Sequence, residues 1–253
     1  MLETMKLQYL SDLHLEIAPM DVPITDADVV VLAGDIHSDG MKAIDWASHF
    51  PQDVIYVLGN HEFYSGDSIV ELPEKLKSYS MRYENVHVLD NDSMIIGGVA
   101  FHGCTLWTDY ELYGNPELAF YYARETISDY RVINFNRAQV FTPELAAALH
   151  KQSIQWLESA IVSSRSRKNV VITHHLPTPK VIQKRFEHNK LNPAFASDCS
   201  QLFHLNISTW IFGHNHSCQQ LEIGGIDFLS NQRGYHDYEK VTNFTAHKII
   251  DIS

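Results

Sequence analysis

The sequence has few cysteines, few basic residues and no long hydrophobic run. Its three cysteines, Cys104, Cys199 and Cys218, are scattered and odd in number, which argues against a disulfide framework or a Cys-x-x-Cys metal site. The longest apolar runs, such as residues 29–33, fall far short of the roughly 18–20 residues that a membrane helix needs. The first residues also lack the basic start and long apolar stretch of a signal peptide. These absences predict a cytoplasmic protein with reduced thiols and no membrane partner.

Basic residues are in deficit: 19 Lys and Arg stand against 31 Asp and Glu, so the formal net charge is −12. Proteins that bind nucleic acid do so mainly through basic patches, and this sequence shows no strong indication of such a patch. The sequence also lacks internal repeats and linkers rich in Pro, Gly or Ser. With 253 residues, of which 45% are hydrophobic, we predict a single domain over residues 1–253.

The sequence does contain a series of short apolar runs, each of which ends at a small polar cluster. Runs of β-branched and aromatic residues that are bounded in this way are typical of strands buried on both faces. The predicted strands cover residues 7–10, 29–33, 54–58, 170–173 and 210–212.

Helices and hairpins are predicted between these strands. The clearest helix covers residues 142–163, with Thr142 as N-cap and a proline in the first turn. The remaining predictions are helices over residues 40–50 and 68–83, hairpins over 86–101 and 221–229, and a closing strand over 244–252.

The polar clusters after the strands are expected to meet in space. Asp12 and Asp35 are 23 residues apart, and Asp35 and Asn60 are 25 apart, which leaves room for a strand, a loop and a short helix each time. Parallel strands joined by such crossovers end at the same edge of a sheet, where ligands bind in open α/β sheets. The converging side chains would be Asp12, His14, Asp35, Asn60, His61, His174, His214 and His216.

This set offers carboxylate, amide and imidazole ligands and no thiolate. Such ligands suit Mn, Fe, Zn or Co better than Ca²⁺, which prefers oxygen alone. Eight groups exceed the needs of one tetrahedral site and are about right for two ions that share a bridging carboxylate. The pattern therefore predicts two divalent or trivalent metal ions as cofactors, with Mn²⁺ as the first choice for activity in vitro.

Five motifs, in this order, carry a family resemblance: Asp12-x-His14, Gly34-Asp35, Gly59-Asn60-His61-Glu62, His174-His175 and Gly213-His214-Asn215-His216. Together they resemble the motif series of the calcineurin-like metallophosphoesterases, and the resemblance runs from about residue 6 to residue 216. It implies an α/β, four-layer fold in which two mixed β-sheets pack face to face and are flanked by helices. It also implies a dimetal enzyme that hydrolyses phosphate esters.

The resemblance further implies a role for each side chain. The first metal would be held by Asp12, His14, Asp35 and His216. The second metal would be held by Asp35 as the bridge, Asn60, His174 and His214. Asn60 and His61 would contact the phosphate, with His61 as general acid and Asp35 as the catalytic bridge. The metal pair would lower the pKa of a water and so supply the hydroxide that attacks phosphorus.

Two positions in the motifs leave alternatives open. The third motif ends in Glu62, where many members of the family have Asp, so the partner of His61 is expected to sit differently. In the adjacent pair His174 and His175, analogy assigns the ligand to His174. Two alternatives remain open for His175: it is the ligand in place of His174, or it supports a neighbouring ligand without binding metal.

Two further segments bear on the substrate. An aromatic stretch at about residues 105–140 is interpreted as an insertion that either packs its own small core or forms a lid or wall that stacks on a base or an aromatic leaving group. Asn231-Gln232-Arg233-Gly234-Tyr235 resembles an Asn-Pro-Arg-Gly-Tyr element of some bacterial members, with Gln232 in place of proline. Arg233 would bind a phosphate oxygen of the substrate or form a structural salt bridge.

The motifs predict the chemistry and leave the substrate open. We expect a small-molecule phosphodiester, because the chain shows no obvious extended surface for a protein substrate. The alternatives are a phosphomonoester phosphatase that acts on a protein or metabolite, a nuclease, and a metal-free scaffold protein. The acidic charge disfavours the nuclease, and the complete ligand series disfavours the scaffold.

Overall fold

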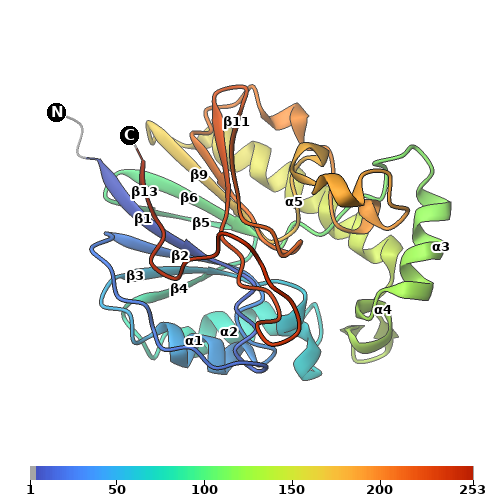
Figure 1. Ribbon diagram of the computed structural model, residues 1–253, viewed down its shortest axis with the longest axis horizontal. Helices are drawn as coiled ribbons and strands as arrows, with labels where there is room; N and C mark the ends of the chain where they lie inside the picture. Colours follow the sequence, from blue (N-terminus) through green and yellow to red (C-terminus); the bar gives the residue numbers. More distant parts are fainter. Residues whose placement is uncertain (1–3, 253) are drawn as a thin grey trace.

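The computed structural model of the protein describes residues 4–252, and two mixed β-sheets form its centre (Figure 1). In spatial order, the first sheet contains β13 (Ile249–Ile252), β1 (Met5–Leu10), β2 (Val29–Ala33), β3 (Asp53–Val57) and β4 (Val86–Leu89). The second sheet contains β11 (Gln219–Ile223), β12 (Ile226–Ser230), β10 (Thr209–Ile211), β9 (Lys168–Thr173), β6 (Val99–Cys104) and β5 (Asp92–Ile96). Neighbouring strands are parallel except that β13, β11 and β5 pair antiparallel at the sheet edges.

The alternation of side chains along the strands produces four layers. In β2, Val29 and Val31 lie in the core between the two sheets, whereas Val30 and Leu32 pack under α1 (Gly40–Ala47) and α2 (Leu72–Ser80). The outer face of the second sheet packs against α5 (Pro143–Ser163), where Leu157 joins the third apolar cluster. The order of layers is therefore helix, sheet, sheet, helix, which confirms the predicted α/β fold.

The predicted long helix and both hairpin turns are confirmed. The helix α5 begins after Thr142, whose hydroxyl accepts a hydrogen bond from the amide of Leu145. The β5–β6 hairpin turns at Gly97 and Gly98, which both have positive φ as a tight hairpin requires. The second hairpin joins β11 and β12.

Several predicted boundaries were wrong, for local reasons. The helix predicted from residue 68 begins at Leu72, because Pro73 suits a first turn and Ser68 instead forms a bridge to Asn134. The strand β4 belongs to the first sheet, so the hairpin comprises only β5 and β6. Residues 11–28, between β1 and β2, contain no helix, and two prolines interrupt that connection. The closing strand covers only β13.

The remaining elements are short and lie mainly between β6 and β10. The helical ones are η1 (His61–Ser65), α3 (Pro116–Thr126), α4 (Asp129–Val132), η2 (Pro179–Val181), η3 (Lys184–Phe186), η4 (Asn192–Ala194) and η5 (Ser200–Leu202). A small separate hairpin pairs β7 (Asn134–Asn136) with β8 (Gln139–Val140). Among the described residues, no helix is both long and apolar enough to cross a membrane.

Candidate metal centre

All eight predicted ligand or acid side chains lie at the carboxyl ends of strands from the two sheets. Asp12 and His14 follow β1, Asp35 follows β2, Asn60 and His61 follow β3, His174 follows β9, and His214 and His216 follow β10. The strands β1, β2 and β3 are parallel neighbours, and β9 and β10 are parallel neighbours in the other sheet. Residues that are up to 204 positions apart in the sequence are therefore brought to one place.

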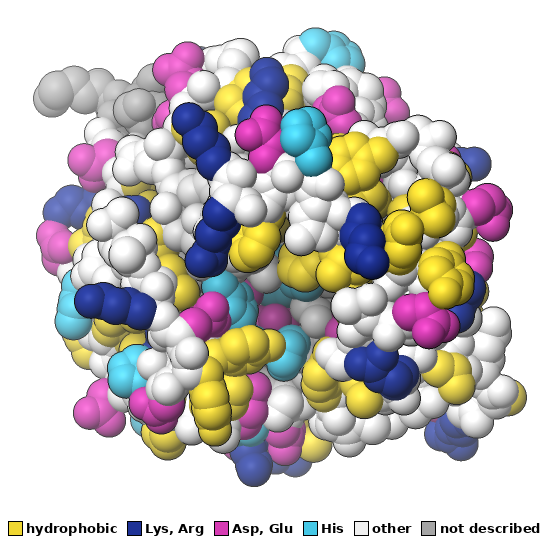
Figure 2. Space-filling model, turned by 45° about the vertical axis from the view of Figure 1, so that its right-hand side comes forward, with side chains coloured by type: hydrophobic (Ala, Val, Ile, Leu, Met, Phe, Trp, Pro, Cys, Tyr) yellow, Lys and Arg dark blue, Asp and Glu magenta, His cyan; other side chains and the backbone are white. Residues whose placement is uncertain are grey.

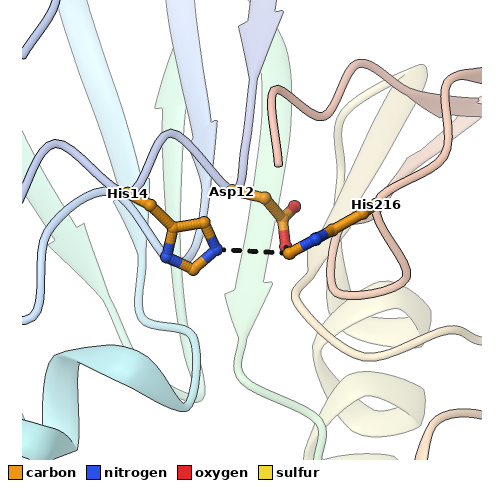
Figure 3. A group of neighbouring side chains, drawn as sticks. All are labelled: Asp12, His14 and His216. Carbon is orange, nitrogen blue, oxygen red and sulfur yellow. Dashed lines mark hydrogen bonds and ion pairs between the residues drawn. The ribbon is translucent and has the colours of Figure 1, made fainter. Parts of the chain in front are cut away.

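Asp12, His14 and His216 form one group of ligand atoms. The Nε2 atoms of His14 and His216 are 3.2 Å apart, and His216 Nε2 lies 3.6 Å from Asp12 Oδ1. Figure 3 shows the three side chains turned towards one another, two from the loop after β1 and one from the loop after β10. Asp12 and His14 are buried, and His216 is partly buried.

Asp35, His174 and His214 form a neighbouring group. His174 Nε2 lies 3.4 Å from Asp35 Oδ2, 3.2 Å from His214 Nδ1 and 3.0 Å from Asn60 Oδ1. Asp35 also reaches the other group, because its Oδ2 lies 3.9 Å from His14 Nε2. Asp35 is therefore placed between the two groups, where a bridging carboxylate would stand.

The outer nitrogens of these imidazole rings face hydrogen-bond acceptors. His14 Nδ1 lies 3.3 Å from Glu16 Oε1, and His216 Nδ1 contacts Glu239. A metal-bound imidazole coordinates through an unprotonated nitrogen, so a ring that donates from Nδ1 to a carboxylate would offer its inward Nε2 to a metal ion. These carboxylates thus orient the rings in the way that outer partners orient metal-bound histidines.

The spacing of the inward atoms fits a metal ion. Two nitrogens that are each about 2.0–2.1 Å from one ion, at angles near 90–110°, stand about 2.8–3.4 Å apart. The separation between His14 and His216 falls in this range, as does that between His174 and His214. The carboxylate and imidazole set also suits a transition metal. The residues present therefore fit the predicted metal pair.

Electrostatics keep the central carboxylate ionised. Burial opposes the charge on Asp35, but the facing rings of His174 and His61 hold the pKa of Asp35 well below its usual range. A carboxylate in its ionised form is the one that can bind metal.

The backbone at the site is held in a rarely used conformation. Five of the predicted ligands have φ between +45° and +78°, namely Asp12, His14, Asp35, His214 and His216. Side chains other than glycine seldom adopt this region, and such strain concentrates at functional sites. The surrounding hydrogen bonds hold it, for example from the amide of His214 to Asp12 Oδ1 at 2.9 Å.

The motif glycines leave the space that the ligands occupy. A Cβ at Gly59 would collide with Asp35 Oδ1, and one at Gly34 would collide with His174 Nδ1. At Gly213 a Cβ would lie 2.7 Å from Asp12 Oδ2. The glycines in these motifs are therefore required by close approach of the ligand side chains.

Glu62 supports the backbone and does not contact the His61 ring. It is fully buried and accepts hydrogen bonds from the amides of Gly59, Asp35 and Ile36 and from the hydroxyl of Tyr56. The carboxylate thereby ties the loop after β2 to the loop after β3. At this motif position the Glu side chain therefore holds the two loops together by hydrogen bonds to their backbone amides.

The His61 ring contacts side chains outside the predicted ligand set. It stacks on Tyr64, with ring centroids 4.4 Å apart, and its Nε2 lies 3.2 Å from the hydroxyl of Tyr235. Its Nδ1 lies 3.9 Å from Glu16 Oε1. Burial raises the pKa of Tyr235, so the hydroxyl stays protonated and can act as a donor.

A cavity of about 380 Å³ opens beside the two ligand groups. Its wall includes Asp35, Asn60, His61, His214 and His216. Figure 2 shows a hollow with histidine and acidic side chains in its depth and hydrophobic and basic side chains around it. This size is within the range of small-molecule sites.

The calcineurin-like phosphoesterase family model matches residues 6–218. The chain belongs to the calcineurin-like phosphoesterase family. Members depend on two metals, so the protein is a metal-dependent phosphoester hydrolase.

Two relatives of this calcineurin-like phosphoesterase extend over nearly its whole length. Uncharacterized protein L509 of Acanthamoeba polyphaga mimivirus is 26% identical over 277 aligned positions, which cover 97% of this chain and 96% of that protein. The structure of phosphopantetheinyl hydrolase from Mycobacterium tuberculosis has a TM-score of 0.78 at 14% identity and covers 98% of this chain and 95% of that one. At that identity the second likeness shows the fold alone.

Of the two adjacent histidines, the structure brings His174 into the ligand groups. His175 Nδ1 donates to the carbonyl of Thr105, and its ring lies against His214, with centroids 4.2 Å apart. Burial and the neighbouring His174 lower the pKa of His175 to about 3, so the ring is neutral. His175 therefore supports His214 in this phosphoesterase, and its Nδ1 is committed elsewhere.

Arg233 is not brought to the cavity. It is buried, and its guanidinium donates hydrogen bonds to the carbonyls of Leu13, Ala18 and Pro19. The neighbour that does reach the cavity is Tyr235. Contact of Arg233 with a substrate therefore receives no support from its surroundings.

The aromatic rings of residues 105–140 mainly join the core under the first sheet. Trp107, Tyr110 and Tyr130 are buried there, and Tyr121 is exposed. The segment supplies only residues 127–129 to the wall of the cavity.

Sequence reasoning missed three carboxylates that contact predicted site residues: Glu16, Asp129 and Glu239. Asp129 accepts hydrogen bonds from Asn60 Nδ2 and from the hydroxyl of Tyr64. The position of Glu16, two residues after His14, was a weak indication in the sequence that the two side chains are in contact. Asp129 and Glu239 lie outside every motif, so only their packing identifies them.

Proposed function

We propose that this calcineurin-like phosphoesterase hydrolyses a small phosphodiester, with Mn²⁺ as an effective metal in vitro. The observation that carries this proposal is the scarcity of basic side chains at the ligand groups. Arg233 is bound to backbone carbonyls, and among the cavity-lining residues that the structure describes Arg185 is the only Lys or Arg.

The charge at the site suits a singly charged substrate. When bound, two divalent ions would supply Lewis acidity and hydroxide near neutral pH. Their four positive charges, set against Asp12, Asp35 and one hydroxide, leave about one positive charge. A phosphodiester carries one negative charge and a phosphomonoester carries up to two. Without a nearby Lys or Arg, the diester is the better match.

Three side chains of the protein would have separate roles in the reaction. Asp35 would hold both halves of the site together from its position between the two ligand groups. His61, next to the Tyr235 hydroxyl, would donate a proton to the departing oxygen. The stack on Tyr64 would keep the His61 ring in place while the substrate binds.

A phosphomonoesterase is the second candidate, and one observation favours it. Residues 180–190 contribute to the cavity wall and carry four exposed basic side chains, Lys180, Lys184, Arg185 and Lys190, against one acid, Glu187. Such a local excess in a chain of net charge −12 would attract a more highly charged phosphate.

Initial rates with two generic esters distinguish the candidates. Chelator-stripped protein receives Mn²⁺ and is assayed with bis-p-nitrophenyl phosphate and with p-nitrophenyl phosphate. Faster metal-dependent turnover of the diester supports the proposal, and a monoester preference overturns it in favour of the second candidate. Absence of metal-dependent turnover of both esters argues for the scaffold alternative.

A further inference from the structure

The cavity extends past the groups that the proposed chemistry uses. Two segments of the chain, residues 127–129 and 176–195, contribute an apolar surface to its wall. We call this surface the apolar slot and define it by Ile127, Leu176, Ile182, Phe186, Leu191 and Phe195. Hydrophobic side chains also gather around the hollow in the space-filling view (Figure 2).

The apolar slot is continuous with the metal-ligand groups. The ring of Phe195 packs against the ring of His214, with centroids 4.7 Å apart. A molecule with its phosphate at the ligand groups would therefore meet the slot within the length of a short substituent.

Hydrogen bonds hold the wall of the slot in shape. Asn192 Nδ2 donates to the carbonyl of Phe186 at 2.7 Å and to the hydroxyl of Tyr113 at 2.8 Å. Gln183 Nε2 donates to the carbonyl of Asn215 at 3.0 Å, which ties the same segment to the loop that carries His214 and His216. A wall that is formed before binding costs little entropy when a ligand enters.

The slot offers little to a charged group. Among the described residues that line the cavity, the one Lys or Arg is Arg185, whose guanidinium lies over the Phe186 ring at 4.6 Å from the centroid. The three acids that line the cavity have other partners: Asp35 lies between the ligand groups, Asp129 accepts from Asn60, and Glu239 contacts His216. An uncharged, apolar occupant matches these surroundings, because burial of its surface is favourable and no charge must be desolvated.

We propose that the apolar slot binds one arm of the substrate, so that the substrate is a phosphodiester with an uncharged alkyl or aryl arm. This inference rests on the proposed function, since it places the phosphorus group at the metal ligands. It makes the segment 176–195, together with Ile127, the part of the chain that selects the substrate.

Calorimetric titration of the Mn²⁺-loaded protein with methylphosphinates tests this proposal. Dimethyl-, n-hexyl(methyl)- and phenyl(methyl)phosphinate each carry one negative charge, as a phosphodiester does, and their P–C bonds cannot be hydrolysed, so binding is measured independently of turnover. A fully buried methylene improves affinity about fourfold. With partial burial, we expect the hexyl and phenyl compounds to bind roughly 10- to 100-fold more tightly than the dimethyl compound.

Two variants locate the effect. Phe186→Ala removes an aromatic side chain that is 41% exposed, and it should reduce the advantage of the n-hexyl(methyl)phosphinate over the dimethylphosphinate about 5- to 10-fold. Tyr121→Ala is the matched control, because that ring is 56% exposed and lies outside the cavity wall, and it should keep the wild-type ratio. Thermal unfolding of each variant verifies that the fold is retained.

The outcomes separate this inference from the proposed function. Equal affinity for the three phosphinates overturns the slot and leaves the phosphoester centre in place. A wild-type ratio in Phe186→Ala overturns the assignment of the slot to this wall. Failure of all three phosphinates to bind metal-loaded protein overturns both the slot and the proposed phosphate position.

Discussion

The carboxylate of Asp129 accepts a hydrogen bond from the side-chain amide of Asn60 at 3.0 Å. This bond orients Asn60 so that its Oδ1 faces His174 Nε2, also at 3.0 Å. The same carboxylate oxygen accepts from the hydroxyl of Tyr64, the residue on which the His61 ring stacks. Asp129, from the aromatic segment, thus contacts Asn60, a predicted metal ligand, and Tyr64, which stacks on the predicted general acid His61.

Asp129→Ala should weaken metal binding and lower stability. The variant leaves the buried amide of Asn60 without its acceptor, which costs about 1–3 kcal/mol of unfolding free energy. Loss of an outer partner of a metal ligand typically reduces metal affinity about 10- to 100-fold. Mn²⁺ titration calorimetry and urea unfolding measure the two effects.

The conservative change Asp129→Asn provides the control. Its side-chain oxygen can still accept from Asn60 and Tyr64, so most of the metal affinity should return. If the Ala variant binds Mn²⁺ as tightly as the wild type, Asp129 does not position Asn60.

Asp35→Asn should lose metal and activity together. Asp35 lies between the two ligand groups, and its ionised form faces three imidazole rings, so its loss affects both metal positions. Metal content by mass spectrometry and turnover of bis-p-nitrophenyl phosphate give the two readouts. Asp227→Asn, at an exposed position in β12, is the matched control. Full metal content together with normal turnover in Asp35→Asn would rule out the bridging role.

Chelation of metal should lower the unfolding temperature of the wild type. The ligands come from distant parts of the chain and meet only in the folded protein, so bound metal stabilises the folded state by mass action. Addition of Mn²⁺ should restore the original temperature in the wild type and in Asp227→Asn. An unfolding temperature that changes neither when chelator is added nor when Mn²⁺ is added would contradict the predicted metal centre.

His61→Ala should keep its metal and lose rate. A general acid contributes roughly 10²–10⁴-fold, and most of that contribution is needed when the leaving group is a poor one. Comparison of aryl phosphodiesters whose leaving groups differ in pKa measures this dependence. Tyr235→Phe, which removes only the hydroxyl beside His61 Nε2, should show a smaller loss with the same trend. An equal loss for good and poor leaving groups speaks against the acid role.

The pH dependence of stability should include a contribution from His102. This ring is buried in the second sheet, where its Nε2 donates to Asn169 Oδ1 at 3.0 Å, and burial lowers the pKa of His102. The unfolded chain binds a proton near pH 6.5 and the folded protein does not. The stabilisation is therefore complete above that pH and is lost as the pH falls through the folded-state pKa.

Urea unfolding of metal-free protein between pH 5 and pH 8 measures this effect. The stability of His102→Gln should fall less steeply with acid than that of the wild type, by up to about 1.4 kcal/mol per pH unit. Parallel curves for the two proteins would show that His102 does not contribute.

The sequence by itself, with the family resemblance of its motifs, was sufficient to predict the layers and to name the side chains that meet at the carboxyl ends of the strands. Buried strands show as continuous apolar runs, and the ligands follow them directly, so both are local patterns. The glycines beside them are local too: Gly34 and Gly59 are needed because ligand side chains lie where a Cβ would be. Parallel pairing of β1, β2 and β3 brings the first three motifs together, and packing of the second sheet adds the histidines that follow β9 and β10.

Tertiary structure alone decided how the other groups are used. Arg233 follows a motif-like element, yet it faces carbonyls near residues 13–19, because β1 and the chain after β12 lie side by side. Asp129 has no motif around it and reaches Asn60 only through the packing of the aromatic segment. The apolar slot combines residues about 50–70 positions apart. Local patterns predict which residues are candidates for metal binding. The direction of a long side chain and the wall of a cavity depend instead on which distant segments pack beside them.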